Sequence, residues 1–170
     1  KLNFLLTWLC LIYFGVIVVI DLEHRLIMHP VSWVGLGLGL VVGTARNGWL
    51  ETLIGGAVGY ASMWLLYWLG ELIIKGLARI RKQALDDVAL GFGDVNLSGV
   101  LGLMLGWPGV LAGIFLAILL AGGLSLVYML VMLVARRYHS SLAIPYGPFL
   151  VASAVILLFF GQELARWMGS

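Results

Sequence analysis

The chain has 170 residues, of which 62% are hydrophobic and 11% are charged, a balance that excludes an ordinary soluble domain. Its formal net charge is only +2 and no basic segment is interleaved with aromatic residues, so nucleic-acid binding is excluded as well. We therefore expect an integral membrane protein surrounded by the lipid bilayer.

Six apolar stretches follow one another along the chain. Lipid offers no hydrogen-bond partner to the backbone, so a spanning segment must be a helix or part of a closed barrel, and these stretches lack the alternation of barrel strands. Their approximate ranges are 2–20, 31–45, 50–74, 95–107, 110–135 and 147–167. The predicted fold is an all-α integral membrane protein with about six transmembrane helices.

The first stretch has no basic n-region and no small-residue cleavage site, and it leads directly into further spans, so a removable signal peptide is not predicted. Cys10, the only cysteine, lies within it, which excludes an intrachain disulfide and a zinc site built on paired cysteines. The chain begins at Lys1 rather than at methionine and so can be a fragment of a longer protein.

Basic residues predict the orientation, because the loops between six spans alternate between the two sides of the membrane. The richer side, expected to be cytoplasmic, takes much of its charge from the polar segment 75–93, which is predicted to be a loop. The residues on this side are Arg25, Lys75, Arg79, Arg81, Lys82, Arg136 and Arg137, and those on the other are Lys1, Arg46 and Arg166.

Asp21 ends the first predicted span and Asp94 begins the fourth, so both carboxylates reach the cytoplasmic side. About a dozen residues, roughly 20 Å of helix, separate Asp94 from the GWPG break at 106–109, too few to span the hydrocarbon core. Asp94 is therefore expected below the membrane boundary, where an ionisable group is costly and usually functional. Gly91 and Gly93 would permit non-helical backbone and the close approach of another chain.

Simpler interpretations are available for these polar residues. Asp94 can be a helix N-cap, an interpretation as well supported as a functional one. Asp21 fits this less well, because its charge would meet the negative end of its helix dipole, although it can mark the water boundary. Glu71 is either a boundary charge or a partner of the site.

Two further patterns are interpreted as structural. The histidines, His24, His29 and His139, lack the additional ligands that a metal site needs, so no metal is predicted. Glycines four residues apart are typical of closely packed membrane helices, and they occur at 35, 39 and 43, at 55 and 59, and at 102 and 106.

Three motifs resemble landmarks of the type IV prepilin peptidase family, the integral-membrane aspartic proteases of the GxGD class related to archaeal preflagellin peptidases. DLEHRLIMHPVS at 21–32 is similar to the first motif, an aspartate that closes a span and is followed by a proline. GFGDVNLSGVLGLMLGW at 91–107 resembles the GxGD motif, and IPYGPFLVASA at 144–154 resembles a Pro-aromatic-Gly-Pro turn. Asn96 stands where the family commonly has Lys, and His29-Pro30 replaces the usual Pro-Asp.

The resemblance implies a GxGD-protease-like bundle with Asp21 and Asp94 as the catalytic pair and without a cofactor. It implies one transmembrane peptidase domain over 1–170, in the inner membrane with its active site facing the cytoplasm, and a prepilin or pseudopilin helix as substrate. The supporting or substrate-binding positions are Gly91, Gly93, Asn96, Pro145, Gly147 and Pro148. The cysteine-bearing segment of bifunctional members is not seen, so N-methylation is not predicted for these residues.

Such an enzyme needs one charged and one neutral carboxyl group, a state that two close carboxyl groups favour because ionising one disfavours ionising the other. Its product would be a prepilin-like protein without its short basic leader.

Two alternatives stay open. A proton-coupled carrier could use Asp94 as a relay, but it needs a polar path, and the spans hold few polar residues beyond Thr7, Ser62, Ser98 and Ser125. A non-catalytic subunit of a pilus or secretion assembly could keep the fold, although it would not need both aspartates.

Overall fold

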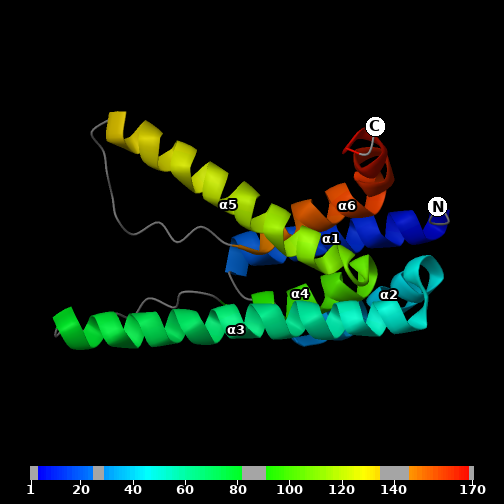
Figure 1. The fold of residues 1–170 in the computed structure, drawn as a ribbon, viewed down its shortest axis with the longest axis horizontal. Helices are drawn as coiled ribbons and strands as arrows, with labels where there is room; N and C mark the ends of the chain where they lie inside the picture. The colour runs from blue at the N-terminus through cyan, green and yellow to red at the C-terminus, as the bar shows by residue number, and fades with distance from the viewer. Residues whose placement is uncertain (1–3, 25–28, 82–90, 135–145, 169–170) are drawn as a thin grey trace.

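The computed structural model describes residues 4–24, 29–81, 91–134 and 146–168, and this part of the chain forms six helices (Figure 1). They are α1 (Phe4–His24), α2 (His29–Asn47), α3 (Trp49–Arg81), α4 (Phe92–Leu105), α5 (Gly109–Val134) and α6 (Gly147–Met168). The predicted all-α fold is confirmed.

Three of these helices are long and apolar enough to cross a membrane by length and composition, within α1 (Phe4–Glu23), α3 (Trp49–Gly76) and α5 (Gly109–Val134). Two shorter apolar helices, Phe92–Leu105 and Gly147–Gly161, accompany them. The chain is therefore a multi-pass membrane protein.

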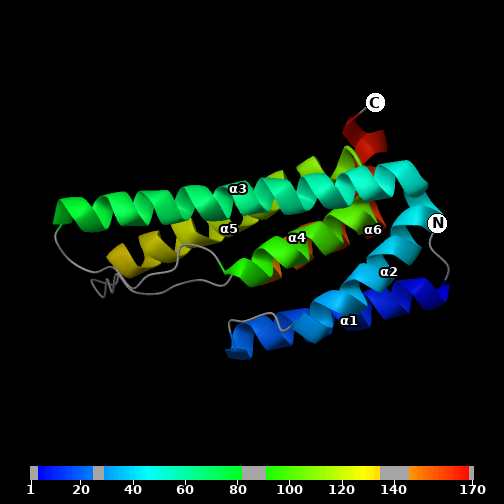
Figure 2. The ribbon, with the colours of Figure 1, turned by 90° about the horizontal axis from the view of Figure 1, so that it is seen from below.

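α4 is the central helix of the bundle. It packs against α2, α3, α5 and α6, and Figure 2 shows it between α3 on one side and α1 with α2 on the other. Ten of its fourteen residues are buried, so the helix exposes no continuous face to lipid. The neighbouring helices shield it, which explains how a helix of only about 20 Å can lie within the membrane.

Glycines allow the backbones of the central helices to meet. A Cβ atom on Gly102 of α4 would lie 2.9 Å from the carbonyl carbon of Gly55 and 3.2 Å from Cα of Gly56, both in α3. Gly43 of α2 is equally confined, since its Cβ would lie 2.6 Å from Cγ2 of Thr52. The predicted small-residue packing is confirmed, and it joins α2, α3 and α4.

Two predicted boundaries are wrong. The third helix continues past residue 74 to Arg81, so residues 75–81 are helical rather than part of a loop. An ion pair one turn apart supports this extension: Lys75 Nζ lies 2.8 Å from Glu71 Oε2. The fourth helix begins at Phe92 instead of residue 95, which places Asp94 inside its first turn. The rest of the predicted loop, 82–90, lies outside the described residues.

Candidate active site

Both aspartates lie at the same end of the bundle, on different helices. Asp21 is in the last turn of α1 and 5% exposed, and Asp94 is the third residue of α4 and 8% exposed. α6 packs against both helices and joins them. The carboxyl group of Asp94 is within electrostatic range of Asp21, so the fold brings the two predicted catalytic residues into one neighbourhood.

Gly147 is in direct contact with Asp21. It is the first residue of α6, and its backbone N–H is directed towards the Asp21 carboxylate. A Cβ atom at this position would overlap Oδ2 of Asp21 and lie 2.9 Å from its Cγ. The absence of a side chain therefore makes room for the carboxylate. Pro148 follows in the first turn, where the missing N–H costs no helical hydrogen bond, and Pro145 lies outside the described residues.

Tyr146 belongs to the same neighbourhood, although the sequence did not single it out. Its hydroxyl is buried and has no hydrogen-bond partner in the described part of the chain, as is also true of Asp21 Oδ2. Burial and, to a smaller extent, the nearby Asp94 together raise the pKa of Tyr146 to about 12. The signal that could have identified it is the hydroxyl-bearing aromatic residue in the PYGP motif.

The non-helical backbone predicted at Gly91 and Gly93 is found at Gly91 but is wrong for Gly93. Gly93 is helical, and Gly91, the N-cap of α4, has φ −75° and ψ 139°, a conformation that any residue adopts. A Cβ on Gly91 would lie 3.7 Å from Asp94 Oδ2, an ordinary contact. The interpretation of Asp94 as the N-cap is wrong too, because Asp94 donates its own N–H to Gly91 O at 3.0 Å and lies inside the helix.

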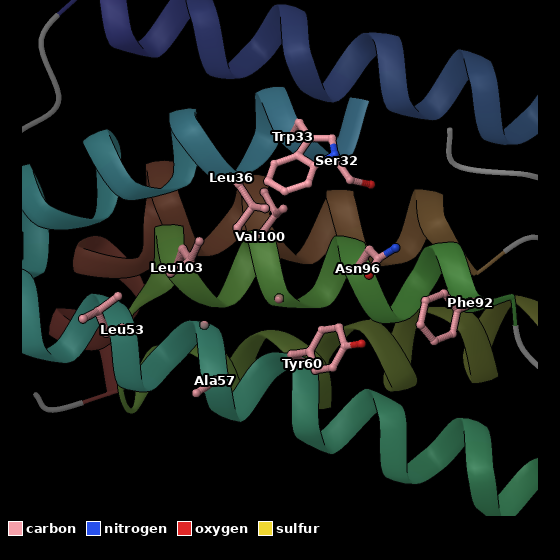
Figure 3. Close-up of a pocket in the computed structure, with 12 residues that line it drawn as sticks. Ser32, Trp33, Leu36, Leu53, Ala57, Tyr60, Phe92, Asn96, Val100 and Leu103 are labelled. Carbon is pink, nitrogen blue, oxygen red and sulfur yellow. The ribbon is translucent and has the colours of Figure 1, made fainter. Parts of the chain in front are cut away.

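Asn96 is separated from the two carboxyl groups. It lines a pocket of about 540 Å³ between α2, α3 and α4, together with Ser32, Tyr60 and Phe92 (Figure 3). Two helical residues advance about 200° around the axis, so Asn96 and Asp94 point in nearly opposite directions. Ser32 Oγ is buried there without a hydrogen-bond partner among the described residues. The pocket and the Asp94 side chain therefore lie on opposite sides of α4, with the pocket behind the helix.

The contacts of α4 with α3 indicate the depth of Asp94. At the far end of the bundle, Trp107 donates its N–H to Glu51 O at 3.0 Å, and at the near end the rings of Phe92 and Tyr67 meet edge to face at 6.0 Å. From Tyr67, α3 continues for about 12 Å before it reaches Lys75, at 1.5 Å per residue. Asp94 is therefore below the level of the first lysine of α3.

Among the described residues, the other candidates do not form a second site. Glu71 pairs with Lys75 and accepts a hydrogen bond from Tyr67 at 3.3 Å, contacts that favour its interpretation as a boundary charge. The described residues contain no group of three His, Cys, Asp or Glu side chains that could hold a metal. Arg25 and His139 lie outside the described residues, as do the side chains of His24 and His29.

Comparison with known proteins links this site to one family. The model of the type IV leader peptidase family matches residues 4–126, which include both aspartates. The prepilin leader peptidase/N-methyltransferase of Aeromonas salmonicida (strain A449) is 29% identical over 167 residues, 96% of this chain and 50% of that protein.

Two further relatives with the same name agree. The protein of Xanthomonas campestris pv. campestris is 30% identical over 152 residues, 85% of this chain and 46% of that protein. That of Pseudomonas aeruginosa is 30% identical over 154 residues, 86% of this chain and 46% of that protein. The chain spans about half the length of the curated relatives it matches. No solved structure matches it significantly.

Proposed function

Because the chain belongs to the type IV leader peptidase family, we propose that it is a membrane-embedded aspartic endopeptidase that removes the leader from prepilin-like proteins. In this proposal Asp21 and Asp94 form the catalytic pair. The observation that supports it most directly is the burial of both carboxyl groups at one end of the bundle, on helices far apart in sequence. Carboxyl groups buried within a membrane are costly and are usually retained for a function.

The chemistry needs only the two carboxyl groups and water. The charged carboxylate takes a proton from water as the water oxygen bonds to the carbonyl carbon. The neutral carboxyl group gives its proton to the carbonyl oxygen, so a neutral tetrahedral diol forms. The first group then passes the proton to the amide nitrogen as the C–N bond breaks. The second recovers a proton from one diol hydroxyl, which leaves the new carboxylic acid and restores the starting state.

Neighbouring residues prepare the pair for this reaction. Gly147 gives the Asp21 carboxylate room and directs a backbone N–H towards it. Asp94 is within the positive, N-terminal turn of α4, which favours a negative charge. The proton shared by the pair belongs to neither residue alone.

The proposed substrate is a prepilin or pseudopilin, whose short basic leader joins an apolar helix. The bond at such a junction would lie where water meets lipid, close to the inferred depth of Asp94. We place the protein in the inner membrane with this end facing the cytoplasm, because the basic residues are enriched there. Gly91 and Gly93, which carry no side chain, would let an extended substrate approach Asp94.

The proton-coupled carrier has less support. It needs polar groups that continue across the bundle. Three buried hydroxyls of the described helices instead donate to nearby carbonyl groups. Thr52 donates to Gly48 O at 2.7 Å and Ser153 to Leu150 O at 2.8 Å. Ser98 donates to Gly59 O at 2.8 Å, which joins α4 to α3.

The test is cleavage of a substrate by the protein reconstituted in liposomes. The family resemblance implies cleavage after a glycine at this junction. The substrate therefore carries a basic leader, a glycine at the junction and an apolar helix, and a matched substrate has a bulky residue in place of the glycine. Mass spectrometry of the products should show one cut after the glycine and none in the matched substrate. Intact substrate, across several leader sequences and with folded protein, would contradict the proposal.

A further inference from the structure

Tyr146 lies between the environments of the two aspartates. It immediately precedes Gly147, which contacts Asp21, and its ring positions the hydroxyl near enough to Asp94 for the two groups to interact electrostatically. Its backbone carbonyl accepts the N–H of Phe149 at 3.1 Å and of Leu150 at 3.3 Å, so the residue is held by the first turn of α6. The backbone of Tyr146 is therefore held by the same helix that contacts Asp21.

The hydroxyl of Tyr146 is an unused donor at this place. It is buried, yet it makes no hydrogen bond to any described residue. Folded proteins leave few buried polar atoms without a partner, and such an atom often marks the place of a water molecule or a ligand. Asp21 Oδ2, which lies against Gly147, is in the same state. Two unpartnered buried oxygen atoms therefore belong to residues at or against the start of α6.

The two kinds of group differ in what they can offer to a ligand. A carboxylate only accepts hydrogen bonds, whereas a phenol also donates one. The pKa of Tyr146 is raised to about 12. The hydroxyl therefore keeps its proton over the pH range in which one carboxyl group is charged and the other is neutral. The site thus contains a permanent neutral donor beside the groups that move protons.

We propose that the Tyr146 hydroxyl donates a hydrogen bond to the oxygen of the scissile carbonyl and stabilises the negative charge that develops there. This inference rests on the proposed peptidase function and names a third catalytic residue for it. The tyrosine keeps its proton throughout, so the proton transfers of the two aspartates are unchanged. A carbonyl oxygen has two lone pairs, and one can accept from the neutral carboxyl group while the other accepts from Tyr146.

The first test is Tyr146→Phe, which removes the hydroxyl and keeps the ring. Loss of one donor to a developing oxyanion typically lowers kcat about 100-fold or more, and we expect a fall of that order with little change in KM. The matched control is Tyr13→Phe, because Tyr13 is also buried but donates to Val31 O at 3.3 Å, away from the aspartates. The control should keep the kcat of the wild type.

The pH profile separates this role from an effect on Asp94. If Tyr146 contacts the substrate, the Tyr146→Phe variant keeps the acidic and alkaline limits of the wild type and loses only rate. A displaced limit would show that the tyrosine acts through the carboxyl groups and would overturn the proposal, as would a kcat equal to that of the wild type.

A second variant covers the case in which Tyr146→Phe folds poorly. A fluorinated tyrosine at position 146 keeps the hydroxyl and the shape of the ring but makes the hydroxyl more acidic. A more acidic hydroxyl is a stronger hydrogen-bond donor, so kcat should change within the pH range in which the wild type is active. An unchanged kcat would overturn the proposal. Wild-type cleavage is the reference throughout: its absence would refute the proposed function, whereas normal cleavage by the variants would refute only the role of Tyr146.

Discussion

At the scale of single residues, the contact between Gly147 and Asp21 leaves no room for a larger side chain. A Cβ on Gly147 would lie 2.9 Å from Asp21 Cγ, so either the start of α6 or the carboxylate must move. We expect Gly147→Ala to lower peptidase activity about 100-fold, the loss that a displacement of about 1 Å can produce in an active site. The measurement is the initial rate of leader removal.

The matched control is Gly161→Ala in the same helix, because a Cβ there has no neighbour within 4 Å. It should cleave at the wild-type rate. Equal rates for both variants would mean that the place of Asp21 does not depend on Gly147.

The positions of the two aspartates could be predicted from the sequence, whereas Tyr146 was not singled out and the surroundings of Asn96 could not be predicted. An acidic residue at the edge of an apolar stretch stands out because membrane burial of charge is rare. A tyrosine at a membrane boundary does not, since such residues are common there. Asn96 is only two positions from Asp94, but the helix directs the two side chains to nearly opposite faces, and Asn96 lines the pocket behind α4. The predicted span began at residue 95 and did not include Asp94, so the sequence did not indicate this separation.

At the scale of helices, the short α4 depends on glycines in its neighbours. A Cβ on Gly43 would overlap the carbonyl oxygen of Leu103 in α4 and lie 2.8 Å from Oγ1 of Thr52. Gly43→Ala should therefore lower the free energy of unfolding by about 1–3 kcal/mol, the usual cost of overpacking. Denaturation in detergent, followed by circular dichroism, measures this change.

Gly37 in the same helix provides the comparison, because it has open space where its Cβ would be. Gly37→Ala should leave stability unchanged or raise it by about 0.5–1 kcal/mol, since alanine favours a helix more than glycine does. If Gly43→Ala were as stable as Gly37→Ala, close packing of α2 on α4 would not contribute to the fold.

The helices themselves follow closely from the apolar pattern, and their boundaries follow less closely. Spacing of four residues predicted that the glycines share helix faces, but it could not show which helices they join. The end of α3 was misplaced because the charges after Ile74 resemble a loop, whereas Glu71 and Lys75 pair along a continuing helix. The pairing partner of a charge is a property of the folded helix that composition alone does not reveal.

At the scale of the whole molecule, the charge distribution predicts that the end of α3 near Lys75 faces the cytoplasm and the end near Trp49 faces the other side. Single cysteines test this arrangement, and the native Cys10, 1% exposed, can be replaced by serine to give a clean background. A membrane-impermeant maleimide should label Trp49→Cys in intact cells and Lys75→Cys only after the membrane is opened. The reverse pattern would place the aspartates on the other side.

The central claim is that Asp21 and Asp94 act together on the peptide bond. The most direct measurement compares leader removal by the wild type, Asp21→Asn and Asp94→Asn, reconstituted side by side, with the unfolding midpoint of each as a check on folding. Asparagine keeps the volume of aspartate but cannot take up or give the proton that the reaction moves. We predict that the wild type cleaves and that both folded variants do not, whereas cleavage by either folded variant would contradict the account.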